Sequence, residues 1–205
     1  TYRKQNDPET AKEARVTYQN DLELYEKNKS TYEREMENLR TDIANQQEYL
    51  DHSIWINMSP YDVCEARADL FVSTGYQIMP GMEYQNRDNT DTILQAYQSL
   101  LTSSAVLEDV AKQVKTEPRY LEELVEVTIG ANQDGQLNRM LTIDVKHTTK
   151  EDAEEVLGAF LAHVDDMHDR IATSIGEHTV SIVNESVSAL VNLDLAELQR
   201  QQTEK

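Results

Sequence analysis

The chain is poor in the residues that mark several classes of protein. Of its 205 residues, one is cysteine, four are proline and six are glycine. A single cysteine excludes a disulfide framework and a cysteine-based metal site within the chain. Cys64 follows Val63 and has no basic neighbour to favour a thiolate, so we interpret it as an inert small residue.

Basic residues are also scarce. Lys and Arg together number 19 against 38 Asp and Glu, which gives a formal net charge of -19. The phosphates of nucleic acids require clustered Lys and Arg, and anionic lipid surfaces attract the same residues. The composition therefore argues against a nucleic-acid partner and against adsorption to anionic lipid.

Long apolar segments are missing as well. The sequence has no signal peptide and no run of 18 apolar residues that could cross a membrane. It begins without Met and stops within a polar helical pattern at residues 196–205. We interpret the chain as part of a longer protein, with any membrane segments outside this sequence.

Motifs of catalysis and cofactor binding are absent too. The sequence has no Ser-His-Asp spacing motif, phosphate-binding loop, dinucleotide glycine pattern or EF-hand loop. We predict that the chain is not an enzyme and binds no cofactor.

The nearest approach to a chemical site is residues 163–169, which include His163, His168 and three aspartates, Asp165, Asp166 and Asp169. Two histidines five residues apart on a helix diverge by about 140° and do not converge on one ligand. We expect a charged outer face there. A hydrolase or metal enzyme that uses this cluster stays open as a minor alternative.

The other three histidines, His52, His147 and His178, each stand at the end of a predicted element. We expect each of these side chains to cap its element or to face water.

A long heptad pattern dominates the first quarter of the chain. Residues 9–52 contain neither Gly nor Pro, and Pro8 opens the stretch. Apolar or aromatic residues recur at spacings of four and three, which is typical of a coiled-coil seam. The predicted oligomer or helix-pairing seam consists of Tyr18, Leu22, Tyr25, Tyr32, Met36, Leu39, Ile43 and Leu50.

Lys29 and Gln46 interrupt this seam as polar positions that could fix its register. A single helix of this length would span about 65 Å at 1.5 Å per residue. Such a narrow seam needs a partner, either the helix after Asn192 or another subunit. Folding back against the core is the remaining alternative.

The middle of the chain predicts an α+β fold, with a small mixed sheet packed on helices and helical extensions at both ends. Its centre is residues 138–186, which read as strand, helix and strand. Leu141, Ile143 and Val145 alternate with polar residues, and Val180 and Ile182 resume that alternation. The helix between them carries one apolar stripe: Ala153, Leu157, Phe160, Val164, Met167 and Ile171.

Cap and turn signals divide the rest of the chain. Thr148 or Thr149 begins the central helix with an acid three residues later, and Gly176 is expected to end it in a left-handed conformation.

Residues 54–56 are predicted as a short strand, and residues 66–72 as a second one. Residues 75–89 read as a loop, residues 89–91 as a helix cap, and 103–104 and Pro118 as starts of two further helices. Residues 125–129 are predicted as a strand. The expected organisation is a stalk at 1–52, a core at 53–191 and the start of a C-terminal helix at 192–205.

Several of these segments resemble one family. Residues 60–70, 104–110 and 120–127 are similar to the first core strand and later segments of Wzz-type chain-length determinants, the polysaccharide co-polymerases. The fit is best at residues 140–153, where a Leu-x-Ile-x-Val strand leads to a helix that begins near Ala153, and residues 179–186 resemble the family's final strand. The likeness covers about residues 53–191 and consists of apolar patterns.

The resemblance implies a non-enzymatic extracytoplasmic domain of a membrane-anchored homo-oligomer. Such a protein would regulate the chain length and export of a surface polysaccharide (capsule, exopolysaccharide, O-antigen or lipopolysaccharide), together with a polymerase and the nascent glycan. Relatives in organisms without an outer membrane also activate a cytoplasmic tyrosine kinase. The long helix before residue 54 and the polar helix after residue 192 depart from the usual family pattern.

A different class stays open: a coiled-coil adaptor or scaffold of an envelope export complex. The heptads suit it, but such linkers carry a small all-β lipoyl-like domain, whereas strands here alternate with helices.

Overall fold

The computed structural model describes residues 8–76, 80–81, 88–131 and 137–203. The chain divides into two compact units, unit 1 up to His52 and unit 2 from Ser53 onward. Each unit is described by itself. Among the described helices, none is both long and apolar enough to cross a membrane.

The described residues of unit 1 form one helix, α1 (Pro8–His52), which confirms the uninterrupted helix predicted over residues 9–52. Pro8 suits the first helical position because its missing N–H would have no helical partner there. Three threonines, Thr17, Thr31 and Thr41, donate their hydroxyls to the carbonyl four residues earlier, each at 3.0 Å. None of the described residues of α1 is buried.

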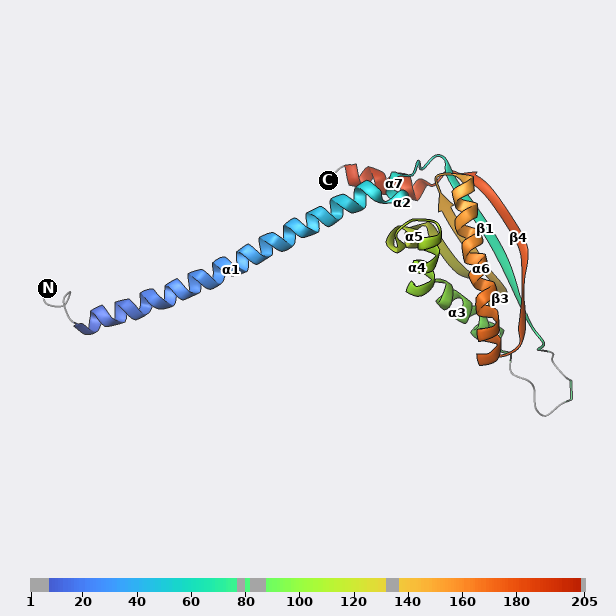
Figure 1. Cartoon of the computed structure of the whole chain (residues 1–205), viewed down its shortest axis with the longest axis horizontal. Helices are drawn as coiled ribbons and strands as arrows, with labels where there is room; N and C mark the ends of the chain where they lie inside the picture. Colours follow the sequence, from blue (N-terminus) through green and yellow to red (C-terminus); the bar gives the residue numbers. More distant parts are fainter. Residues whose placement is uncertain (1–7, 77–79, 82–87, 132–136, 204–205) are drawn as a thin grey trace. The chain divides into compact units, whose positions relative to one another are not determined.

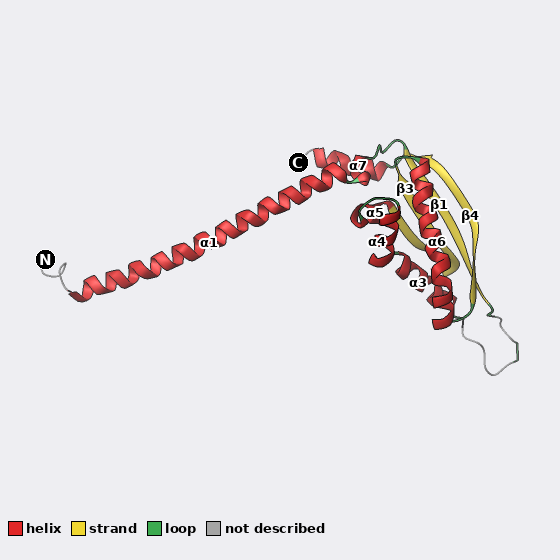
Figure 2. Ribbon diagram, viewed as in Figure 1, coloured by secondary structure: helices red, strands yellow, loops and turns green. Residues whose placement is uncertain are grey.

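Unit 2 is a four-stranded sheet with helices, which confirms the α+β class (Figures 1 and 2). Its elements, in chain order, are α2 (Ile54–Asn57), β1 (Val63–Thr74), α3 (Thr90–Leu101), α4 (Ser104–Gln113), α5 (Pro118–Leu124), β2 (Val125–Ala131), β3 (Leu137–His147), α6 (Lys150–Ser174), β4 (His178–Leu190) and α7 (Leu193–Thr203).

The sheet has the order β2-β3-β1-β4 and all its pairs are antiparallel. The prediction of a mixed sheet was wrong. β3 and β4, the two strands joined by α6, do run in the same direction, but β1 lies between them and is antiparallel to both. The parallel strands are therefore never neighbours.

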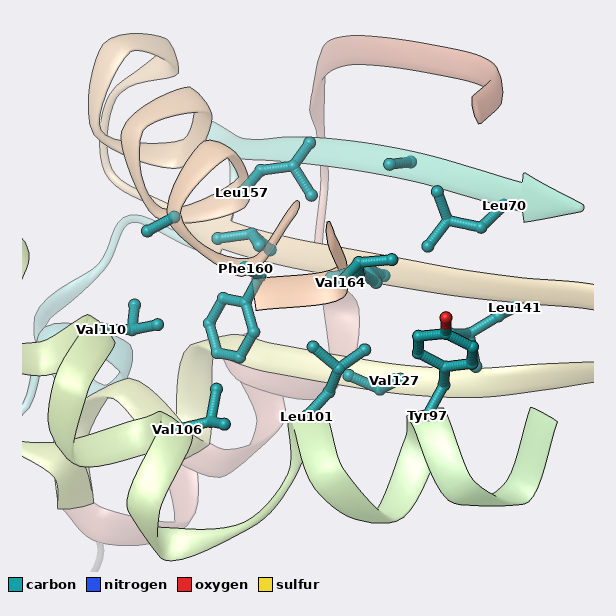
Figure 3. Packing of buried hydrophobic residues seen from close by; sticks show 14 of the residues in the cluster. Leu70, Tyr97, Leu101, Val106, Val110, Val127, Leu141, Leu157, Phe160 and Val164 are labelled. Atoms are coloured by element: carbon teal, nitrogen blue, oxygen red, sulfur yellow. The ribbon is translucent and has the colours of Figure 1, made fainter. Parts of the chain in front are cut away.

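Helices α3, α4, α5 and α6 lie on one face of this sheet (Figure 2). Alternate strand residues point toward them, because successive side chains of a strand face opposite sides. Figure 3 shows Phe160 of α6 between the helices and strands, near Val106, Val110 and Leu101. The predicted apolar stripe of α6 is buried at every position, from Ala153 to Ile171.

A smaller cluster closes one end of the sheet. Met58, Val63, Leu124 and Leu195 are each at most 2% exposed and pack together. The α7 helix, which supplies Leu195, thus belongs to unit 2.

The caps of the central and last helices follow the sequence. Thr149, not Thr148, begins α6, since its Oγ1 accepts from the backbone N–H of Asp152 at 3.1 Å. Asn192 begins α7 in the same way, accepting from the N–H of Leu195 at 3.0 Å.

The structure corrects several local predictions, and the first concerns residues 54–56. They form helix α2 and not a strand, because Ser53 caps the turn: its Oγ accepts from the N–H of Ile56 at 3.2 Å and donates to Glu123 Oε2 at 3.0 Å. A buried cap thus overrides the strand preference of Ile-Trp-Ile.

Two end residues also behave differently from the prediction. The side chain of Asn89 does not cap α3; it donates to the carbonyl of Ile175 at 3.2 Å, and Asp88 accepts from the N–H of Thr90 at 3.0 Å instead. Gly176 follows α6 with φ +157°, close to extended backbone and unlike the predicted left-handed helical conformation. Most of the predicted loop at 75–89, and residues 132–136, lie outside the described residues.

Candidate self-association surface

The predicted seam of α1 carries large apolar side chains that the chain itself leaves exposed. The exposed fraction runs from 38% at Leu50 to 67% at Tyr18. The residues with these exposures are Tyr18, Leu22, Tyr25, Tyr32, Met36, Leu39, Ile43 and Leu50. Isolated exposed apolar residues are common, but eight along one stripe of one helix are typical of a surface that binds another chain.

Lys29, a polar member of the stripe, has a local partner. Lys29 Nζ lies 3.9 Å from Glu33 Oε1, a helical i,i+4 pair with both side chains largely exposed. Such exposed pairs contribute little free energy. Tyr25, Tyr32 and Met36 border a shallow hollow along the helix beside Lys29. The seam is thus mostly apolar and tyrosine-rich, with Lys29 as a cation among its positions.

The entry to unit 2 and the start of α7 lie side by side. Gln199 Nε2 donates to the carbonyls of Ile56 and Met58, each at 2.8 Å, and the N–H of Asn192 donates to the carbonyl of Pro60 at 2.7 Å. The two flanks of unit 2 therefore meet at one end of the sheet.

The cluster at residues 163–169 does not form a metal site. Asp165, Asp166 and Asp169 are exposed, and His163 is half-buried. Among the described residues, no group of three or more His, Cys, Asp or Glu side chains is placed to hold a metal ion.

His178 is buried, although we expected its side chain to cap its element or to face water. It is 5% exposed, and its Nδ1 lies 2.9 Å from the carbonyl of Gly176, which can only accept. Nδ1 therefore carries the proton in the neutral ring, and Nε2 accepts from the hydroxyl of Tyr97 at 2.8 Å. Burial, with a smaller contribution from Asp165, raises the pKa of Tyr97 to about 12, so its hydroxyl stays protonated as the donor.

His168 adds a third ring to this group. Its Nε2 donates to the carbonyl of His178 at 3.0 Å, and its Nδ1 lies 3.3 Å from Asp169 Oδ1. Both contacts favour the imidazolium, and they raise the pKa of His168. The group ties the C-terminal half of α6 to the first residue of β4.

The two remaining histidines lie at helix and strand ends as predicted. His52 is exposed and its Nδ1 lies 2.9 Å from the carbonyl of Glu48. The His147 side chain is only 13% exposed and pairs with Asp152 at 3.4 Å; burial lowers its pKa, an effect that Asp152 opposes.

The sheet face away from the helices carries a cross-strand polar network that the sequence did not reveal. Arg67 Nη2 donates to Asp144 Oδ2 at 2.9 Å while Nε lies 2.8 Å from Oδ1, and this pairing raises the pKa of Arg67. Asp69 accepts from Thr142 at 2.7 Å and from Asn184 at 2.9 Å. These residues occupy polar positions in strands where polar and apolar residues alternate, but only the pairing register shows that they are neighbours.

Comparison of the chain with models of protein families and with curated proteins finds no match in either.

Proposed function

We propose that this chain is the extracytoplasmic part of a membrane-anchored homo-oligomer that regulates the chain length and export of a surface polysaccharide. The observation that carries the proposal is the exposed seam of α1, because a stripe of this kind requires another helix to cover it. The role in polysaccharide synthesis comes from the resemblance of residues 60–70, 104–110, 120–127, 140–153 and 179–186 to Wzz-type co-polymerases.

Unit 2 supports the proposal in two ways. The resembling segments fall on β1, α4 to β2, β3 with the start of α6, and β4, so they make up one core. The flanks of that core meet at one end of the sheet. A chain that leaves a membrane and returns to the same membrane requires such an arrangement. The adaptor alternative fits less well, since a sheet covered by helices is unlike an all-β lipoyl-like domain.

In the proposed mechanism the seam sets the register of the assembly, and that register determines how far the nascent glycan is held before a polymerase releases it. Regulation of a cytoplasmic tyrosine kinase would be a further activity of the whole protein.

The direct test is the size distribution of surface polysaccharide in a strain without this gene, compared by gel with the parent. We expect a defined modal length to be lost and to return with the intact gene. An unchanged ladder would refute the regulator and favour an adaptor.

A seam variant tests the mechanism. Replacing Leu39 and Ile43 by Asp should dissociate the oligomer and shift glycan length, because charges cannot be buried in an apolar seam. The matched control is Asn38→Asp with Ala44→Asp, which adds two carboxylates to exposed positions on the other side of α1. Unchanged glycan length in a dissociated Leu39→Asp, Ile43→Asp chain would contradict the ruler mechanism.

A further inference from the structure

A small cavity lies at the N-terminal end of α6, where that helix meets α2 and α5. It has a volume of about 190 Å³, and its apolar walls come from Ile54, Leu121, Leu124 and Val156. Three of these walls, Leu121, Leu124 and Val156, are at most 2% exposed. A cavity of about 150 Å³ is enough to hold a benzene molecule, so this one can take a branched aliphatic group.

Charged side chains border the same cavity. Lys115 lies in the segment between α4 and α5, and Glu155 lies on α6. Both are exposed, and among the described residues neither has an ion-pair partner. A cation and a carboxylate that share a cavity without pairing can each bind the opposite charge of a ligand.

His147 adds a hydrogen-bond acceptor to this cavity. Its Nδ1 lies 3.4 Å from Asp152 Oδ2, and a carboxylate can only accept, so Nδ1 carries the proton in the neutral ring. Burial lowers the pKa of His147 more than Asp152 raises it, which favours this neutral form. Nε2 is then an acceptor to which none of the described side chains donates a hydrogen bond.

The backbone of Lys115 is unusual for a residue that carries a side chain. Its φ is +57°, in the left-handed region that glycine commonly occupies just after a helix. The N–H of Thr116 donates to the carbonyl of Ala111 at 2.9 Å, which is the hydrogen bond of that glycine-type helix end. Lysine costs strain here that glycine would avoid, and a role of its side chain at the cavity accounts for that cost.

We propose that this cavity binds a small α-amino acid with an aliphatic side chain. The ammonium group would donate to Glu155 and to Nε2 of His147, and the carboxylate would accept from Lys115. The aliphatic group would pack against Leu121 and Leu124. A ligand with a single charge would leave either Lys115 or Glu155 unmatched. The cavity shares no residue with the seam of α1, so the inference does not depend on the proposed function.

Titration of the full chain with L-leucine, followed by nuclear magnetic resonance, tests the site. We expect saturable shifts of the backbone amide signals of Thr116, His147 and Glu155, with a dissociation constant of about 1 mM for a ligand of this size. The analogues 3-methylbutylamine and 4-methylpentanoate each lack one charged group of leucine. We expect each analogue to bind at least about tenfold more weakly.

Lys115→Gly separates binding from folding, because glycine adopts the same backbone conformation without strain. We expect leucine binding to weaken at least about tenfold, while the unfolding midpoint in urea is no lower than that of the parent. Glu155→Gln should weaken binding to a similar extent. The matched controls, Lys112→Gln and Glu154→Gln, remove the same charges from exposed neighbours that do not border the cavity, so they should leave binding unchanged.

Weaker leucine binding in both cavity variants, with both controls unchanged, would uphold the proposal. The absence of a saturable shift at about fifty times the expected dissociation constant would overturn it. Equal binding of 4-methylpentanoate and leucine would also overturn it, because the ammonium group would then contribute nothing. Leucine binding that Lys115→Gly leaves unchanged would have the same meaning for the carboxylate.

Discussion

The hydroxyl of Tyr97 and Nε2 of His178 form a buried hydrogen bond between α3 and the start of β4. Tyr97→Phe would leave that nitrogen buried without its donor. We expect the free energy of unfolding to fall by about 1–3 kcal/mol, as for other buried polar atoms that lose a partner. Urea denaturation followed by circular dichroism measures the change.

Tyr61→Phe is the matched control, because that ring is 71% exposed. We expect it to change the free energy of unfolding by less than about 0.5 kcal/mol. Equal effects of the two substitutions would mean that the Tyr97 hydroxyl contributes nothing specific.

His168 should make stability depend on pH. Its pKa is raised in the fold, so its contribution is complete below the unfolded value of about 6.5 and is lost as pH rises through the higher folded value. His147 acts in the opposite sense, since its pKa is lowered and its contribution is lost as pH falls. A comparison of variants separates the two.

We expect the difference in melting temperature between the parent chain and His168→Gln to be largest near about pH 5.5 and smaller by about pH 8. Asp169→Asn should reduce this pH dependence, because it removes the carboxylate beside Nδ1. A difference that grows with pH would contradict the assignment.

At the scale of the elements, the start of α6 offers a clean comparison between adjacent threonines. The Thr149 hydroxyl caps the helix, whereas that of Thr148 contacts only the ring of His147 among the described hydrogen bonds. Thr149→Ala should lower the free energy of unfolding by about 1 kcal/mol, the usual cost of a lost cap. Thr148→Ala should have a clearly smaller effect in the same urea titration, and the reverse order would place the cap one residue earlier.

Elements with long periodic patterns were predictable, whereas the shortest element, α2, was not. The stripe of α6 repeats from Ala153 to Ile171 within a helix of 25 residues, so no single contact could override it. Ile54 to Ile56 span less than one helical turn, and there a hydrogen bond from the Ser53 cap to Glu123, 70 residues away, decides the conformation. The sequence around residues 54–56 therefore could not predict that contact.

Strand order was unpredictable for the same reason. We expected strand, helix and strand at 138–186 to belong to a small mixed sheet, but the neighbour of both strands is β1, which precedes them by about 70 residues or more and is antiparallel to each. His178 was misjudged likewise, since its partner Tyr97 comes from 81 residues away.

For the whole molecule, net charge should control association. The seam is apolar while each copy carries -19, so repulsion between copies opposes the contact. Raising salt from about 0.01 M to about 0.1 M shortens the Debye length from about 30 Å to about 10 Å and should strengthen self-association. Sedimentation velocity measures it, and association that weakened with salt would indicate ion pairs between copies in place of apolar contact.

The candidate surface itself could be read from sequence more fully than the fold. Heptad spacing identified the eight seam residues, and the structure places all of them on exposed positions of one helix. The partner of these residues could not be predicted, because an apolar seam shows that another helix covers it but does not show which helix. The cavity at the start of α6 gave no sequence signal, since its lining residues come from separate elements that only the fold brings together.

The position of β1 at the centre of the sheet has a consequence for how the protein is made. β1 precedes the two strands that pair with it, and those neighbours come from 69–83 and from about 104–127 residues later in the chain. Until Leu190 has emerged, one side of β1 has no strand to pair with. We therefore expect the sheet to fold only when β4 is available, and to fold slowly, as for other proteins rich in distant contacts. If the chain crosses a membrane, as the proposed function requires, this sheet would remain unfolded, and so able to cross, until β4 is available.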